Sequence, residues 1–211
     1  MFAQDRDVLY LEPHAFTDAL WAGRRLASGI ATVSGTTLVA SSVDAGFDVA
    51  GAAAGGVIVF NGVPYEITAV ASATELGLSR LRASVDDASL PPAPASNASF
   101  TLVSFAPQIA LVHAQIMAML GLDDPEGPGE AAVVAESAGA LANVEALGAL
   151  HLVYASASAL AGPSSAIGAR AVMYREMFSR AQRVLAVRLD VDGDGIADAT
   201  RRPGVVQLVR G

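Results

Sequence analysis

Two β-prone runs face each other across an Asn-Gly pair in the first third of the chain. Residues 57–60 read Val-Ile-Val-Phe, residues 63–67 read Val-Pro-Tyr-Glu-Ile, and Asn61-Gly62 separates them. Both turn residues tolerate positive φ, which a type I′ turn between antiparallel strands requires. The sequence therefore predicts a tight β-hairpin at this point.

Further β-prone segments surround the hairpin and extend the strand-rich zone from residue 28 to residue 105. They lie within residues 30–39, 75–81 and 100–105, so five or six short strands are expected. Such a set would close into a small antiparallel barrel or pack as a sandwich. Residues 86–98 contain three prolines and are predicted to form an exposed loop.

Helical periodicity replaces strand periodicity on both sides of this zone. Residues 13–27 begin with Pro and carry an apolar face, which predicts a first helix. Pro107 opens another helix, which Gly121 closes. The Ala-rich residues 130–160 predict a long helix, and residues 164–189 a last one. The expected fold class is α+β: a helical bundle with an inserted small antiparallel β-barrel or sandwich and an extended C-terminal arm.

The expected domain organisation has four parts. Residues 1–27 form an N-terminal segment with the first helix of the bundle, and residues 28–105 form the inserted barrel domain. Residues 106–189 form the rest of the helical bundle, and residues 190–211 an Asp/Gly loop with the C-terminal arm. A chain of 211 residues with 53% apolar residues is long and apolar enough to bury a core.

Composition narrows the function classes. The net charge of −8 disfavours a general nucleic-acid or membrane surface, because binding phosphate needs a positive footprint. The chain contains no Cys, which excludes thiolate metal sites and Cys nucleophiles, and no Lys, which excludes a phosphate loop of the Walker type. Glu136, Glu145 and His151 interrupt the apolar run of residues 131–161, so a packed helix and no membrane span is expected.

No catalytic constellation is apparent. His14, His113 and His151 lie on predicted helices without an Asp, Glu or Ser at a triad or metal spacing, and they are interpreted as structural histidines. The adjacent carboxylates Asp86-Asp87 and Asp123-Asp124 fall in predicted loops, where such pairs usually stay solvated. We therefore expect a binding protein rather than an enzyme.

The sharpest motif is the run Asp-Val-Asp-Gly-Asp-Gly-Ile-Ala-Asp at residues 190–198. Carboxylates at alternate positions can curl around a hard cation, and Ca²⁺ is the natural candidate. The candidate metal ligands are Asp190, Asp192, Asp194 and Asp198. Arg201 stands where an EF-hand loop has its bidentate Glu, so the motif is incomplete. The alternative, equally supported, is a turn in which the Asp side chains cap backbone amides.

Three stretches carry a resemblance when they are taken together. Residues 5–13 run into Leu20-Trp21-Ala22-Gly23, the strand-rich segment follows, and the helical end carries the Asp-Gly repeat. In this combination the chain resembles a head-to-tail adaptor, or connector, of tailed bacteriophages. Residues 204–210, Gly-Val-Val-Gln-Leu-Val-Arg, are similar to the extended arm with which adaptors reach a neighbouring ring. The resemblance covers most of the chain, and the inserted barrel is its departure from a minimal adaptor.

The resemblance implies a non-enzymatic structural virion protein. Its implied partners are further copies of itself in a ring, expected to be a dodecamer, together with the portal protein and tail or neck proteins. DNA would be present only as the passing genome, and no membrane is implied. Assembly is expected in the host cytoplasm, and the final location in the neck of the virion. The arm residues expected to contact the portal are Val205, Val206, Leu208 and Val209. The alternative hypothesis is a calcium-binding adhesin or tail-fibre-associated module, motivated by the β-module and the Asp loop.

Overall fold

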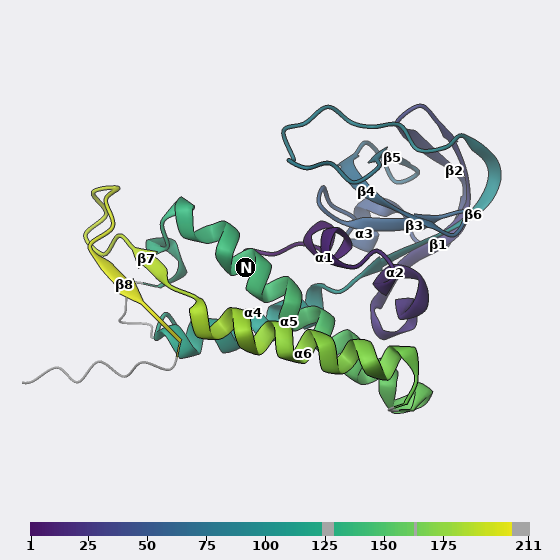
Figure 1. Cartoon of the computed structure of the whole chain (residues 1–211). Helices are drawn as coiled ribbons and strands as arrows, with labels where there is room; N and C mark the ends of the chain where they lie inside the picture. The colour runs from purple at the N-terminus through teal and green to yellow at the C-terminus, as the bar shows by residue number, and fades with distance from the viewer. Residues whose placement is uncertain (124–128, 163, 204–211) are drawn as a thin grey trace, which may run out of the picture.

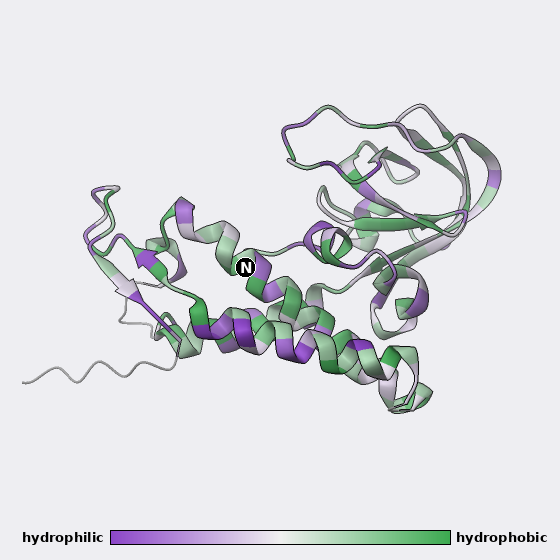
Figure 2. Cartoon of the chain, viewed as in Figure 1, coloured by the Kyte–Doolittle hydropathy of each residue, from purple (hydrophilic) through white to green (hydrophobic). Residues whose placement is uncertain are grey.

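A closed β-barrel and a body of packed helices make up the chain (Figure 1). The computed structural model describes residues 1–123, 129–162 and 164–203. The fold class is α+β, as predicted. Figure 2 shows apolar residues along both the barrel strands and the helices, and the buried ones form two separate clusters, one inside the barrel and one among the helices.

Six antiparallel strands close the barrel in the order β1-β2-β5-β4-β3-β6. The first and last strands pair along most of their length, so the chain enters and leaves the barrel on neighbouring strands. The interior is filled by branched and aromatic side chains that alternate with outward-facing residues. The strands are β1 (Arg24–Ser34), β2 (Thr37–Val43), β3 (Val57–Phe60), β4 (Val63–Val70), β5 (Glu75–Ser79) and β6 (Ala95–Ser104), with the short helix α3 (Phe47–Ala50) between β2 and β3.

The predicted hairpin turn is confirmed. Phe60 pairs with Val63, and the two residues between them, Asn61 and Gly62, have φ angles of 50° and 77°. Two successive positive φ angles are the signature of a type I′ turn, whose twist matches that of the flanking strands. The prediction of an antiparallel barrel is confirmed as well.

The N-terminal segment does not form the single helix predicted over residues 13–27. It holds three short pieces instead: α1 (Asp5–Leu11), α2 (Ala15–Asp18) and the 3₁₀ turn η1 (Leu20–Ala22). Gly23 is extended, and from Arg24 onward the chain pairs with the end of β6, where Arg24 lies opposite Ser104. The helix prediction was wrong because these backbone groups close the barrel, which no local pattern reveals.

The long loop before β6 is held by two arginines. Arg82 Nη1 donates to the carbonyl oxygens of Val85 and Asp87 at 2.7 and 2.8 Å. Arg80 Nε donates to the carbonyl oxygen of Pro91 at 2.9 Å. The loop is mostly exposed, as predicted, but it ends at Pro94 rather than at residue 98, because residues 95–98 already belong to β6.

Three helices form the helical body: α4 (Ala106–Leu120), α5 (Ala135–Ala161) and α6 (Ala166–Val184), with the 3₁₀ turn η2 (Glu130–Ala132) before α5. The central helix α5 packs against both α4 and α6. Gly148 allows this double contact, because a Cβ atom there would lie 2.6 Å from Val112 and 2.8 Å from Phe178. The side chains of Val112 on α4 and Phe178 on α6 therefore both pack against the backbone of α5 at this one glycine.

The helix α5 is long and apolar enough, by length and composition, to cross a membrane. More than half of its most apolar stretch is buried within the protein, and the fully buried Glu145 lies in the middle of the helix. Helices at the centre of a packed helical core have the same composition, which agrees with the contacts that α5 makes here.

A small two-stranded sheet follows α6 where the sequence predicted a helix up to residue 189. The strand β7 (Val187–Leu189) pairs with β8 (Ala199–Arg201). The prediction was wrong because Val187 and Leu189 are buried on either side of the exposed Arg188, which is a strand period. The predicted C-terminal arm with Val205, Val206, Leu208 and Val209 lies outside the described residues.

Candidate functional site

The Asp loop connects β7 with β8 and projects from the end of the helical body (Figure 1). Gly193 and Gly195 have φ angles of 80° and 87°, which residues with a side chain rarely adopt. Counted from Asp190, Gly195 is the sixth residue, where an EF-hand loop has the glycine of its sharp turn. The glycines thus fold the segment back on itself and direct the Asp side chains toward one another.

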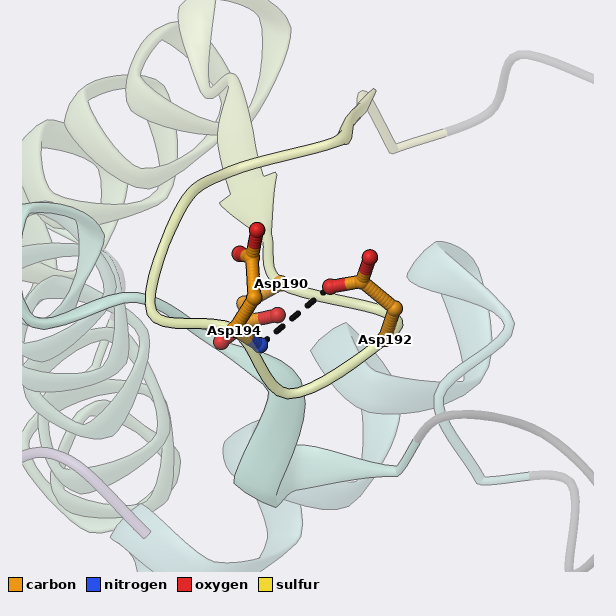
Figure 3. A group of neighbouring side chains, drawn as sticks. All are labelled: Asp190, Asp192 and Asp194. Carbon is orange, nitrogen blue, oxygen red and sulfur yellow. Dashed lines mark hydrogen bonds between the residues drawn. The ribbon is translucent and has the colours of Figure 1, made fainter.

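Three of the four predicted ligands come together. One carboxylate oxygen each from Asp190, Asp192 and Asp194 lies within 4.8 Å of the other two (Figure 3). Asp192 and Asp194 are exposed, and Asp190 is half-buried. A group of carboxylate oxygens at this spacing has the donor chemistry that Ca²⁺ prefers.

The fourth predicted ligand, Asp198, closes the base of the loop. Its Oδ2 accepts hydrogen bonds from the backbone amides of Val191 and Asp192 at 3.0 and 3.4 Å. Arg201, at the position of the closing EF-hand ligand, points to the end of α4 instead. Its Nη1 donates to the carbonyl oxygens of Leu120 and Gly121 at 2.8 and 2.7 Å, and so caps that helix.

The clustered carboxylates also cap backbone amides, as the alternative interpretation of the motif predicts. Asp190 accepts from the amides of Gly193 and Gly195 at 2.7 and 2.8 Å. Asp192 Oδ1 accepts from the amide of Asp194 at 3.2 Å, drawn as the dashed line in Figure 3, and Asp194 Oδ1 accepts from Ile196 at 2.7 Å. These bonds shape the loop without a cation. Asp192 and Asp194 each have a second carboxylate oxygen, Oδ2, that takes part in none of these hydrogen bonds.

A buried ion-pair cluster, which the sequence analysis missed, joins the barrel to the N-terminal segment. Glu66 on β4 is fully buried, and its Oε1 accepts from Arg6 Nε on α1 at 2.9 Å and from Arg82 Nη2 at 2.8 Å. Burial by itself raises the pKa of Glu66, but the hydrogen bonds of Arg82 and the charges of both arginines outweigh it and hold that pKa below its usual value. The available signal was a charged residue inside a buried strand, between Tyr65 and Ile67.

A second missed cluster holds the start of the described chain on α5. Glu145 Oε2 accepts from the backbone amides of Phe2 and Ala3 at 2.9 and 2.8 Å. Its Oε1 lies 2.7 Å from His113 Nδ1 on α4, and His113 Nε2 lies 3.2 Å from Glu130. His113 therefore has hydrogen-bonding partners at both ring nitrogens, which agrees with its interpretation as a structural histidine.

Acidic residues of the N-terminal segment attach it to two other parts of the molecule, the start of α4 and the helix α6. Asp5 Oδ1 accepts from the amide of Phe105 at 2.7 Å, and burial raises the pKa of Asp5 to about 6. Glu12 accepts from the hydroxyl of Tyr174 at 3.0 Å on α6, and Asp18 accepts from Arg170 Nη1 at 2.8 Å. Arg170 and Tyr174 lie one turn apart on α6, so Glu12 and Asp18 hold the segment to the same stretch of that helix.

No protein-family model, curated protein or solved structure matches the chain. The interpretation of its function therefore rests on the residues themselves. Two features of the described chain bear on it: the acidic loop at one end of the molecule, and the buried polar contacts that fix the barrel to the helices.

Proposed function

We propose that the protein is a structural virion subunit, a head-to-tail adaptor that forms a ring between the portal and the tail of a bacteriophage. The ring is taken to be a dodecamer in the virion neck, assembled in the host cytoplasm, with the genome passing through it. The helical bundle forms the subunit contacts, and the inserted barrel faces outward or toward the tail. The arm with Val205, Val206, Leu208 and Val209 docks on the portal. The protein acts by binding, without turnover.

The observation that best supports this proposal is the set of buried polar and apolar contacts that joins the barrel to the helical body. In a closed ring, an angular error in each subunit is repeated around the circle, so a subunit needs a fixed shape. The helix α1 lies at the joint: Arg6 reaches Glu66 of the barrel, and Asp5 accepts from Phe105 at the start of α4. Buried charge pairs of this kind tolerate few alternative arrangements, because a displaced partner leaves an uncompensated charge.

The proposal is tested by native mass spectrometry of the purified protein, alone and mixed with a portal ring from the same genome. Rings, or stable binding to the portal, are expected. A variant that ends at residue 203 separates the two contacts, since it should still associate with itself but lose the portal. A full-length monomer that ignores the portal would contradict the adaptor function.

The second candidate function is that of a calcium-binding adhesin or tail-fibre-associated module. The grouping of Asp190, Asp192 and Asp194 around a glycine turn favours it. In this case the protein would bind Ca²⁺ and a surface ligand, and it would neither form rings nor bind the portal.

Calcium binding has its own test. If the Asp loop holds Ca²⁺ in the native state, a concentration of 100 times Kd should stabilise the fold by about 2.7 kcal/mol, because the unfolded chain lacks the site. Asp192→Ala with Asp194→Ala should abolish this rise in melting temperature. The matched control, Asp86→Ala with Asp123→Ala, removes two exposed acids elsewhere and should keep it. Identical melting of the wild type in Ca²⁺ and in chelator would leave the loop as a hydrogen-bonded turn only.

A further inference from the structure

The helix α6 exposes apolar residues that cover nothing within the described chain. At 100° per residue, Met173, Met177 and Val184 fall within a narrow sector of the helix, away from the buried Tyr174 and Phe178. Their exposed fractions are 43%, 40% and 76%. Three large apolar side chains in a row on one side of a surface helix are typical of a contact surface.

Two exposed arginines lie on one side of this sector, with the exposed Glu176 between them on the helix surface. Arg180 lies beside Met177 and Val184, and Arg183 follows on the next part of the helix surface. Neither forms an ion pair with any of the residues that the structure describes. They are unlike the chain as a whole, which carries a net charge of −8. We call Met173, Met177, Arg180, Arg183 and Val184 the α6 face.

The tip of the β7–β8 hairpin has the opposite charge and a similar share of apolar surface. Asp192 and Asp194 are exposed, and Val191 and Ile196 between and beside them are 54% and 66% exposed. Neither carboxylate has a cationic partner among the described residues. We call these four residues the hairpin tip.

The hairpin tip cannot reach the α6 face of its own molecule. Its strands are held at the end of the helical body, because the amide of Val134 donates to Arg188 at 3.2 Å and the amide of Asp190 donates to Ala132 at 2.8 Å. From there the loop projects away from α6 (Figure 1). A complementary pair of surfaces that cannot meet within one molecule can meet between two.

We infer that the hairpin tip of one copy docks on the α6 face of a second copy. The carboxylates meet the two arginines, and the valine and isoleucine of the tip cover the methionines. The contact joins two different surfaces, so copies can be added one after another. Such a chain of copies closes into a ring when the rotation from one copy to the next divides a full turn. This inference rests on the proposed ring function and names the surfaces that build the ring.

Charge reversal tests the contact through two variants. The first is Arg180→Glu with Arg183→Glu, and the second is Asp192→Arg with Asp194→Arg. Each variant alone presents like charges at every contact, so the ring species should be lost from native mass spectra. An equimolar mixture restores opposite charges when the variants alternate, and the ring should return. Arg24→Glu, at an exposed arginine on β1, is the control and should leave the ring intact.

The outcomes separate the inference from the function on which it rests. Rings that persist in both reversed variants, or that fail to return in the mixture of folded variants, would overturn the docking contact and leave the adaptor proposal standing. Wild-type protein that never associates would overturn both. Wild-type rings also provide a test that needs no variant, because 1 M salt should weaken a contact built on exposed charges several-fold; rings that are insensitive to salt contradict it.

Discussion

Single buried carboxylates determine how the N-terminal segment is held. Asp5, Glu66 and Glu145 are each less than a tenth exposed, and each bonds to a part of the chain far away in sequence. A buried carboxylate without partners is costly, so the native arrangement is the one that supplies all three with donors. These residues therefore favour one packing of the segment, because another packing would leave a buried carboxylate without donors.

Removal of the Glu145 carboxylate should loosen the start of the chain. Glu145→Ala leaves the amides of Phe2 and Ala3 without their acceptor, and we expect it to lower the free energy of unfolding by about 3 kcal/mol. Glu136→Ala on the same helix removes an exposed ion pair with Arg188 and should cost less than about 1 kcal/mol. Denaturant unfolding measures both. Hydrogen exchange at residues 2 and 3 should rise only in the first variant, and equal costs would contradict this account.

The pKa of Asp5 makes stability depend on pH. Its pKa is raised from 3.8 to about 6 in the fold, so the folded state favours the protonated form. The stabilisation is fully present below pH 3.8 and is lost as the pH rises through about 6. Asp5→Asn keeps an acceptor for the amide of Phe105 but has no charge. Relative to the wild type, this variant should gain about 2 kcal/mol between pH 4 and pH 7. A difference that does not change with pH would contradict the assignment.

Among the elements, the sequence could predict those whose structure depends on residues close to one another in the chain. The Asn61-Gly62 turn and the barrel strands follow from turn chemistry and alternation, and the grouping of Asp190, Asp192 and Asp194 follows from their spacing. The helix expected up to residue 27 failed because those residues pair with β6, which lies far along the chain. The role of Asp198 depends on the register of β8, and no spacing rule contains that information.

Gly148 sets the distance between the three long helices. In Gly148→Ala, the new methyl group would press on Val112 and Phe178, so α4 or α6 must shift away from α5. We expect a loss of about 1 to 3 kcal/mol from this overpacking. Gly139→Ala, on the same helix, places its methyl group in open space and should stabilise the fold by about 0.5 to 1 kcal/mol. Thermal unfolding of both variants tests this account. Crowding at residue 148 should lower the melting temperature and helix propensity at residue 139 should raise it, so changes of the same sign in the two variants would contradict it.

For the whole molecule, the cluster around Glu66 joins the two cores. Val57 and Val59 of β3 also pack into the helical core, so the joint combines apolar contact with charge. None of these long-range pairings could be predicted from sequence, since Arg6 and Glu66 come from segments of different periodicity. A charged residue in a buried strand indicates that an oppositely charged partner exists, but the sequence does not identify which residue it is.

The arginines of the joint should differ in their contribution. Arg82→Ala removes two of the four donors to Glu66 and frees the carbonyls of Val85 and Asp87, so we expect a loss of about 3 to 5 kcal/mol. Arg6→Ala leaves Glu66 paired with Arg82 and should cost about 1 to 3 kcal/mol. The control Arg25→Ala removes an exposed pair with Asp44, worth less than about 1 kcal/mol. Denaturant titrations should rank the three variants in this order, and any other order contradicts the arrangement.

The pairing of β1 with β6 places the entry and the exit of the barrel on adjacent strands, with Arg24 opposite Ser104. Strand partners of this kind lie only about 5 Å apart. Insertions, deletions or a complete exchange of the segment between them would therefore leave the spacing of the helical ends unchanged. An exchanged barrel would also have to supply a partner for Arg6 and apolar side chains for the helical core, as Glu66 and Val57 do here. The part of the barrel away from this joint is thus where changes of length should disturb the helical body least.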